Sequence, residues 1–148
     1  MLKVGDRVPD FISKDQDGTI VKLSDYRGQK LIIFFYPRAN TPGCTAEACN
    51  LRDNYAELKR MGYELLGVSE DSSRKQTNFK NKYDLPFPLL ADEDHTVIDT
   101  FGVWGPKKFM GREFDGLLRT TFILDEEGII EKVIDKVKTK DHAAQLLD

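Results

Sequence analysis

The run Leu31–Tyr36 constrains the fold more strongly than any other part of this sequence. Its six residues, LIIFFY, are all apolar, β-branched or aromatic. Successive side chains of a strand point to opposite faces, so a run without a polar position predicts a strand buried on both faces, as in parallel sheets covered by helices. Pro37 follows directly and ends the strand. The chain is therefore expected to contain a sheet with helices on both sides.

Helical and strand patterns alternate along the rest of the chain. Apolar residues at spacings of three and four between Pro42 and Met61 predict an amphipathic helix that ends at Gly62. This alternation predicts an α/β protein with a central mixed β-sheet flanked by helices, and the thioredoxin-like fold is one member of that class. The other expected elements are strands at 64–69, 87–91, 119–124 and 129–134, and helices at 72–83, 95–101 and 141–147.

Two segments lie outside this alternation. Strand-like residues on both sides of the turn Asp15–Gly18 predict an N-terminal β-hairpin at the edge of the larger sheet. Four glycines and a proline between residues 102 and 116 predict a long loop with little regular structure, which either borders the active site or the surface where the electron donor docks, or merely covers the core. The basic residues of that loop, Lys107, Lys108 and Arg112, are expected to be solvated.

Composition excludes several classes of protein. The 148 residues contain no repeat or linker, which predicts a single domain over residues 1–148. A net charge of −3 gives no general electrostatic reason to bind nucleic acid or an anionic membrane. The sequence has no long apolar run, and the charged N-terminus does not resemble a secretory signal. We therefore expect a cytoplasmic protein with no nucleic-acid or membrane partner.

Of the two cysteines, Cys44 is expected at the start of the long helix, just beyond the carboxyl end of the buried strand, where open α/β sheets place their sites. The thiolate is the reactive form of cysteine, and the first turn of a helix stabilises an anion. Pro42 fits the first helical position, where its missing N–H is no loss. If Glu47 faced the sulfur, its negative charge would disfavour the thiolate form of Cys44. A positive charge from Arg119 or Arg38 would then offset Glu47 and favour the thiolate.

The spacing of Cys44 and Cys49 has a structural consequence. In an ideal helix, residues five apart have Cα atoms separated by roughly 8.6 Å. A disulfide spans no more than about 7 Å between Cα atoms. A Cys44–Cys49 disulfide therefore requires at least the first turn of the helix to unwind. Cys49 either resolves an oxidised Cys44 in this way or is a small buried hydrophobic residue.

The sequence around Cys44 is similar to a known family. The pattern Pro37-x-x-x-Thr41-x-x-Cys44 resembles the active-site signature of peroxiredoxins. The longer stretch from Phe35 to Cys49 resembles the bacterioferritin comigratory protein branch, also called peroxiredoxin Q. The resemblance covers nearly the whole chain and includes the segments Val8–Phe11, Asp15–Gly18, Leu66–Ser69, Leu90–Glu93, Phe101–Gly105 and Arg119–Asp125.

The resemblance implies a thioredoxin-like fold and a thiol-dependent peroxidase that reduces hydrogen peroxide and organic hydroperoxides without a metal, haem or flavin. Cys44 would be the peroxidatic cysteine, which is oxidised to a sulfenic acid. Cys49 would resolve it, forming an intramolecular redox-active disulfide. An outside dithiol, thioredoxin or a relative, would reduce that disulfide. The expected role is antioxidant defence and redox homeostasis, carried out by a monomer.

The same resemblance assigns roles to residues around the sulfur. Thr41 would hydrogen-bond the peroxide, and Arg119 would lie beside the thiolate. Both side chains suit these roles, because a hydroxyl both donates and accepts and a guanidinium keeps its charge. Pro37 would shield a substrate pocket that Pro42 and Gly43 also line.

Two other functions remain open from the residues alone. A general thiol–disulfide oxidoreductase on the same fold would normally carry C-x-x-C, whereas this chain has C-x₄-C. A redox sensor would use the cysteine pair to expose helix surface to a partner, and it would be oxidised once instead of turning over.

The remaining chemically active residues have simpler explanations. The two cysteines with His95 and His142 could bind zinc on count alone, but zinc sites use more closely spaced ligands. His95 is expected to be exposed or to cap a helix. The acidic residues 92–94 are expected to cap that helix and complement its dipole.

Overall fold

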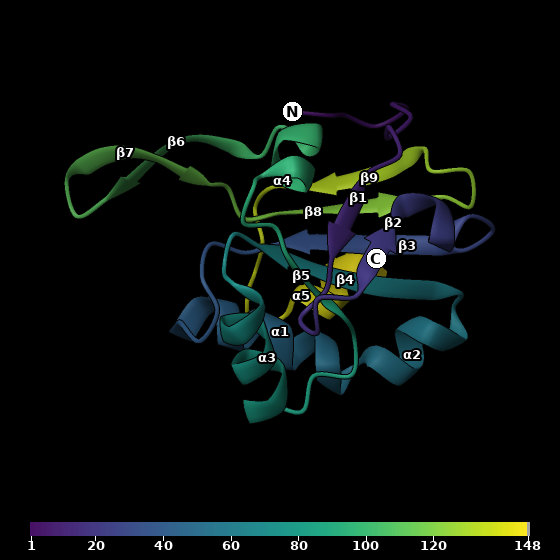
Figure 1. Ribbon diagram of the computed structural model, residues 1–148, viewed down its shortest axis with the longest axis horizontal. Coiled ribbons are helices and arrows are strands. Elements are labelled where there is room, and N and C mark those ends of the chain that lie inside the picture. Colours follow the sequence, from purple (N-terminus) through teal and green to yellow (C-terminus); the bar gives the residue numbers. More distant parts are fainter. Residues whose placement is uncertain (148) are drawn as a thin grey trace.

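The apolar run forms β3 (Lys30–Phe35), the central strand of a five-stranded sheet. In the computed structural model, which describes residues 1–147, the strand order is β5–β4–β3–β8–β9 (Figure 1). β3 pairs in parallel with β4 and antiparallel with β8, so the predicted mixed sheet is confirmed. The other strands of this sheet are β4 (Tyr63–Ser69), β5 (Leu89–Ala91), β8 (Thr120–Leu124) and β9 (Ile130–Ile134).

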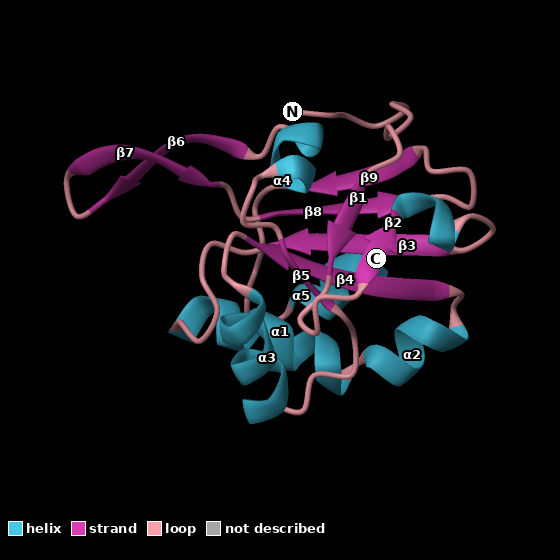
Figure 2. Cartoon of the chain, viewed as in Figure 1, coloured by secondary structure: helices cyan, strands magenta, loops and turns pink. Residues whose placement is uncertain are grey.

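Both faces of the sheet are covered, as the apolar run requires (Figure 2). Ile32, Phe34 and Tyr36 pack in one core cluster with residues of α1, α2, α3 and α5. Leu31, Ile33 and Phe35 pack in the other cluster with α4 and the N-terminal segment. The helices are α1 (Pro42–Asp53), α2 (Tyr55–Arg60), α3 (Ser73–Lys82), α4 (Thr96–Phe101) and α5 (His142–Leu147).

The helix predicted from Pro42 to Met61 is instead two helices, and α1 ends where Asn54 interrupts it. The Asn54 side chain donates from Nδ2 to the Asn50 carbonyl at 2.8 Å. Asparagine side chains compete in this way with the backbone for helical hydrogen bonds. Asn54 has φ −111° and ψ 9°, outside the helical region, so the prediction of one continuous helix is wrong at this residue.

The N-terminal hairpin is present as β1 (Ile12–Lys14) and β2 (Ile20–Lys22), followed by a 3₁₀ turn at Leu23–Tyr26. Its predicted position on the edge of the main sheet is wrong. The hairpin forms a two-stranded sheet of its own and approaches β5 at an isolated bridge between Asp15 and Leu90. The carboxylate of Asp15 accepts from the Asp17 and Thr19 amides, which uses its side chain to close the turn.

The segment predicted as a loop between residues 102 and 116 is a second hairpin, β6 (Trp104–Phe109) and β7 (Arg112–Leu117), which projects from the body (Figure 1). Phe109 pairs with Arg112, so the connection is Met110 and Gly111. Both connecting residues have positive φ, 52° and 79°, as a type I′ turn requires. Of the glycines that suggested a loop, Gly111 lies in this turn, whereas Gly105 and Gly116 lie within the two strands.

The acidic residues before α4 cap that helix, as predicted. Asp92 is buried, and its carboxylate accepts from the Val97 and Ile98 amides at 3.0 and 2.7 Å. Asp94 accepts from the Thr96 amide. His95 occupies the N-cap position, as expected, but its side chain makes no capping hydrogen bond and contacts Glu70 instead.

Gly67 in β4 leaves no room for a side chain, and this gives a stability prediction. A Cβ at this position would lie 2.8 Å from Leu89 Cδ2 and 2.9 Å from Phe34 Cζ. Gly67→Ala is expected to lower the free energy of unfolding by about 1–3 kcal/mol, the usual cost of overpacking a core. Urea denaturation measures the change. Gly105→Ala is the control, because its Cβ would make an ordinary 3.4 Å contact; equal losses in both variants would contradict the prediction.

Candidate active site

Cys44 lies in the first turn of α1, at the carboxyl end of β3. Thr41 is the N-cap residue with extended backbone, Pro42 occupies the first turn, and the Thr45 amide donates to the Thr41 carbonyl at 2.8 Å. Pro42 therefore has the role predicted for it. The side chain of Cys44 is 1% exposed and packs in the core cluster with Tyr36 and Ala48. The sulfur is thus held at a helix N-terminus and shielded from bulk water.

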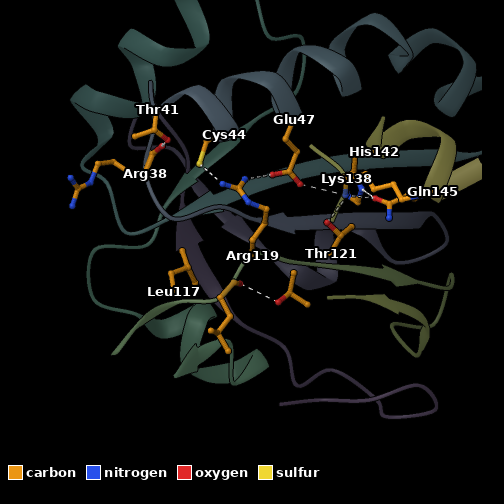
Figure 3. A network of polar contacts seen from close by, with 12 residues as sticks. Arg38, Thr41, Cys44, Glu47, Leu117, Arg119, Thr121, Lys138, His142 and Gln145 are labelled. Atoms are coloured by element: carbon orange, nitrogen blue, oxygen red, sulfur yellow. Dashed lines mark hydrogen bonds and ion pairs between the residues drawn. The ribbon is translucent and has the colours of Figure 1, made fainter. Parts of the chain in front are cut away.

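Arg119 joins Cys44 to Glu47 (Figure 3). Arg119 directly precedes Thr120, the first residue of β8, and Thr120 pairs with Phe35 at the end of β3. Arg119 therefore lies next to the carboxyl end of β3. Its Nη2 donates to Cys44 Sγ at 3.2 Å, and its Nη1 donates to Glu47 Oε1 at 2.7 Å. Residues three apart on a helix lie on one face, so one planar guanidinium reaches both.

Of the two candidate cations, Arg119 is the one beside the sulfur. Arg38 is exposed, and its side chain points away from Cys44 in Figure 3. Burial lowers the pKa of Arg119, but Cys44 and Glu47 raise it above its ordinary value. The guanidinium therefore remains charged in this half-buried position.

Thr41 and Gly43 are half-buried residues at the start of α1. The Thr41 hydroxyl donates to the Arg38 carbonyl at 2.7 Å, which leaves its oxygen lone pairs free to accept. A Cβ on Gly43 would lie 3.3 Å from Arg119 Nη2, so glycine permits the guanidinium to approach α1 closely. Pro37 is half-buried and Pro42 is exposed.

Glu47 and His142 form a buried extension of the site that sequence reasoning missed. Both side chains are 0% exposed, and His142 Nε2 lies 3.6 Å from Glu47 Oε2. His142 also contacts the Thr121 hydroxyl and Gln145 Oε1, each at 2.8 Å (Figure 3). His142 is 98 positions after Cys44, so no local spacing in the sequence indicates this proximity.

Asn50 holds the C-terminal helix against α1. Its Nδ2 donates to the Lys140 carbonyl at 3.2 Å, and its Oδ1 accepts from the Ala143 amide at 2.8 Å. The Asn50 side chain thereby satisfies a backbone donor in the first turn of α5. These two bonds fix the adjacent residue, His142, over Glu47.

Cys44 and Cys49 are both free thiols in an unbroken α1. Cys49 is half-buried, outside the two core clusters, unlike the small buried hydrophobic residue that was the alternative. Residues five apart on a helix are too distant for a disulfide. Oxidation to a Cys44–Cys49 disulfide would therefore require the start of α1 to unwind.

The base of the β6–β7 hairpin lies near this site. Lys107 is half-buried and donates from Nζ to the Leu117 carbonyl at 2.8 Å. Burial lowers the pKa of Lys107; the charge of Arg119 lowers it further, whereas Cys44 raises it. The expectation that Lys107 is solvated surface is thus wrong, whereas Lys108 and Arg112 are exposed as expected.

Across residues 1–147, His, Cys, Asp and Glu side chains form no group of three or more that could hold a metal ion. None of the helices in this part of the chain is long and apolar enough to cross a membrane.

Comparison with known proteins identifies the family. Residues 4–133 match the AhpC/TSA family. The chain is 51% identical over 141 residues to peroxiredoxin Bcp of Escherichia coli (strain K12), covering 95% of this chain and 90% of that protein. The crystal structure of peroxidoxin BcpB from Mycobacterium tuberculosis superposes with a TM-score of 0.87 at 37% identity, covering 99% of this chain and 95% of that one.

A further structure bears on activity. Xanthomonas campestris bacterioferritin comigratory protein, described for its alkyl peroxide reduction activity, matches with a TM-score of 0.86 and 34% identity, covering 93% of this chain and 87% of that one. The predicted thioredoxin-like fold and the predicted resemblance are both confirmed. The chain therefore belongs to the AhpC/TSA family and is a peroxiredoxin, a thiol-dependent peroxidase.

Proposed function

We propose that Cys44 is the peroxidatic cysteine and that it reduces hydrogen peroxide and organic hydroperoxides. The observation that carries this proposal is the contact of Arg119 Nη2 with Cys44 Sγ at 3.2 Å, on a sulfur placed at a helix N-terminus. A fixed positive charge and the helix dipole both favour the thiolate over the thiol. Reduction of alkyl peroxide by the Xanthomonas campestris relative supports the substrate class.

The first step is a displacement on oxygen. The Cys44 thiolate attacks the outer oxygen of the hydroperoxide, an S–O bond forms, and the O–O bond breaks. The sulfur is oxidised to a sulfenic acid, and the leaving alkoxide or hydroxide takes up a proton to become an alcohol or water. Negative charge moves from sulfur to the leaving oxygen, so donors fixed along that line stabilise the transition state.

Arg119 and Thr41 are the groups proposed to supply these donors. The Arg119 fork already contacts the sulfur, and the Thr41 hydroxyl lies at the N-cap of the same helix. When peroxide binds, the Thr41 hydroxyl can exchange the Arg38 carbonyl for a peroxide oxygen. Pro37, Pro42 and Gly43 complete the proposed pocket, with Gly43 admitting the guanidinium.

Cys49 is proposed to resolve the sulfenic acid. Its thiol attacks the Cys44 sulfur, the S–S bond forms, and water leaves. The first turns of α1 unwind for this step, because the helical positions are too far apart. An outside dithiol, which we propose to be thioredoxin, then attacks the disulfide and is itself oxidised, returning two thiols.

We also propose a cytoplasmic monomer. Two cysteines that act in a redox cycle suit a compartment whose reductants return them to thiols. One chain holds both cysteines and the arginine, so the reaction needs no residue from a second copy. Size-exclusion chromatography of the reduced and oxidised protein tests the assembly.

Steady-state turnover tests the proposed activity. Peroxide-dependent oxidation of excess thioredoxin is measured by stopped flow, with hydrogen peroxide and with bulkier alkyl hydroperoxides. An enzyme consumes many equivalents of peroxide for each chain. A single stoichiometric oxidation would instead indicate the redox sensor that the sequence leaves open.

Cys49→Ser separates the two cysteine roles. The variant is expected to form the Cys44 sulfenic acid at an unchanged rate but to stop turning over with thioredoxin, since no second thiol remains in the chain. Trapping with a dimedone probe followed by mass spectrometry detects the sulfenic acid. A small monothiol, which can attack the sulfenic acid directly, should restore turnover. Full turnover with thioredoxin alone would show that Cys49 is dispensable.

A further inference from the structure

Glu47 carries a buried oxygen without a hydrogen-bond partner. Oε1 accepts from Arg119 at 2.7 Å, but Oε2 has no such partner within the described residues. The His142 Nε2 atom lies 3.6 Å from Oε2, beyond hydrogen-bond distance. Leaving a charged oxygen buried without a donor is costly. The surroundings of Glu47 therefore disfavour its ionised form.

The contacts of Gln145 fix the proton on His142. Gln145 Nε2 donates to the Lys136 carbonyl at 3.0 Å, and Gln145 Oε1 accepts from the Lys138 amide at 2.9 Å, which together set the orientation of this side-chain amide. Oε1 can only accept, so His142 Nδ1, 2.8 Å away, must carry hydrogen. In the neutral ring, Nε2 then holds a lone pair that accepts from the Thr121 hydroxyl at 2.8 Å.

Nε2 therefore has no hydrogen to donate to Oε2, and its lone pair disfavours a carboxylate oxygen more than a neutral carboxylic acid. Burial raises the pKa of Glu47 to about 7, against the lowering effect of Arg119. Burial also lowers the pKa of His142, which favours the neutral ring. We propose that Glu47 is held as a neutral carboxylic acid because the neutral ring of His142 offers its buried Oε2 no donor, and that His142 is thereby a positioning residue for Arg119.

The consequence for the reaction is electrostatic. A neutral Glu47 still accepts from Arg119 through its carbonyl oxygen, but it has no negative charge to compete with Cys44. The positive charge of the guanidinium is then balanced by the thiolate. The charged or titratable groups that face this pair are Arg119 before β8, Cys44 on α1, Lys132 on β9 and, acting on Arg119, Lys107 on β6.

This inference rests on the roles proposed above for Cys44 and Arg119, so its test begins with spectra that need no turnover. The chain has two histidines, and His95→Gln assigns their signals. With ¹⁵N-labelled histidine in the reduced protein, His142 is expected to show a protonated Nδ1 and an unprotonated Nε2 at pH 6. Hydrogen on Nε2 would overturn the proposal. Failure of Cys44 or Arg119 as catalytic groups would leave this signal unchanged.

Infrared difference spectra test whether the carboxyl group of Glu47 carries a proton. At pH 6 the wild type minus Glu47→Gln difference should contain the carbonyl stretch of a protonated carboxyl group. Glu126→Gln, which removes an exposed carboxylate, should not change that band. His142→Phe replaces the ring nitrogen that faces Oε2 with an apolar edge and should shift the band. Absence of the band, or a band that ignores His142→Phe, would contradict the assignment. If that variant does not fold, the histidine spectrum of the wild type decides.

The pH dependence of the peroxide step links the pair to Arg119. Above about pH 7 Glu47 ionises, and its charge competes with the thiolate for the guanidinium. The second-order rate constant of the wild type, divided by that of Glu47→Gln, should therefore fall by roughly five- to tenfold as the pH rises from 6 to 8.5. A constant ratio would show that ionisation of Glu47 does not affect the rate of the peroxide step.

Discussion

Cys44→Ser is expected to abolish catalytic peroxide reduction, lowering the rate by about four orders of magnitude or more. A serine hydroxyl at this position stays protonated, is a poor nucleophile toward oxygen, and cannot be oxidised to a sulfenic acid. Hydrogen peroxide consumption in the presence of excess thioredoxin measures the loss. Cys49 remains in this variant, and any slow reaction left would be that of an ordinary half-buried thiol.

Folding must be separated from chemistry in this experiment. Serine is close to cysteine in size, so thermal unfolding should show a protein with its fold intact. Cys49→Ser is the matched control, because it removes the other thiol of α1 and should still undergo a single rapid oxidation. Retained turnover in Cys44→Ser would remove this residue from the mechanism.

Arg119→Met is expected to slow the peroxide step by about 10²–10³-fold, the usual effect of removing one fixed donor that stabilises developing charge. The variant loses the hydrogen bond to Cys44 Sγ and the positive charge that favours the thiolate. Single-turnover kinetics of the Cys44 oxidation give the second-order rate constant directly. Methionine preserves much of the apolar length of arginine, which limits the cavity left beside α1.

Two further variants show whether this loss is specific. Arg38→Met removes the other arginine that the sequence offered for this role, and it should leave the rate within about twofold because Arg38 is exposed and screened. Arg119→Lys keeps a charge but not the planar fork that joins Cys44 to Glu47, so it should recover only part of the rate. Equal losses in Arg38→Met and Arg119→Met would show that the effect is general electrostatics.

Local patterns predicted the elements around the site well. The apolar run identified β3, the spacing of α1 followed from its apolar residues, and Pro42 marked the helix start. The failures have local causes that periodicity does not register. Asn54 breaks the helix through a side-chain hydrogen bond, and Met110 adopts the left-handed backbone that closes the β6–β7 hairpin. Each feature depends on the conformation of one residue, which the spacing of apolar residues does not indicate.

The sequence by itself determined the fold class, the family resemblance and the cysteine at a helix N-terminus, because these depend on periodicity and on residues close together in the chain. Helix and strand patterns left open which arginine approaches the sulfur until the family resemblance pointed to Arg119, and nothing in the sequence connected His142 with Glu47. Only the tertiary structure shows the contacts of both residues, since the start of β8 and α5 bring Arg119 and His142 to α1 from distant positions. Burial also raises the pKa of Glu47, and burial is a property of the packed chain.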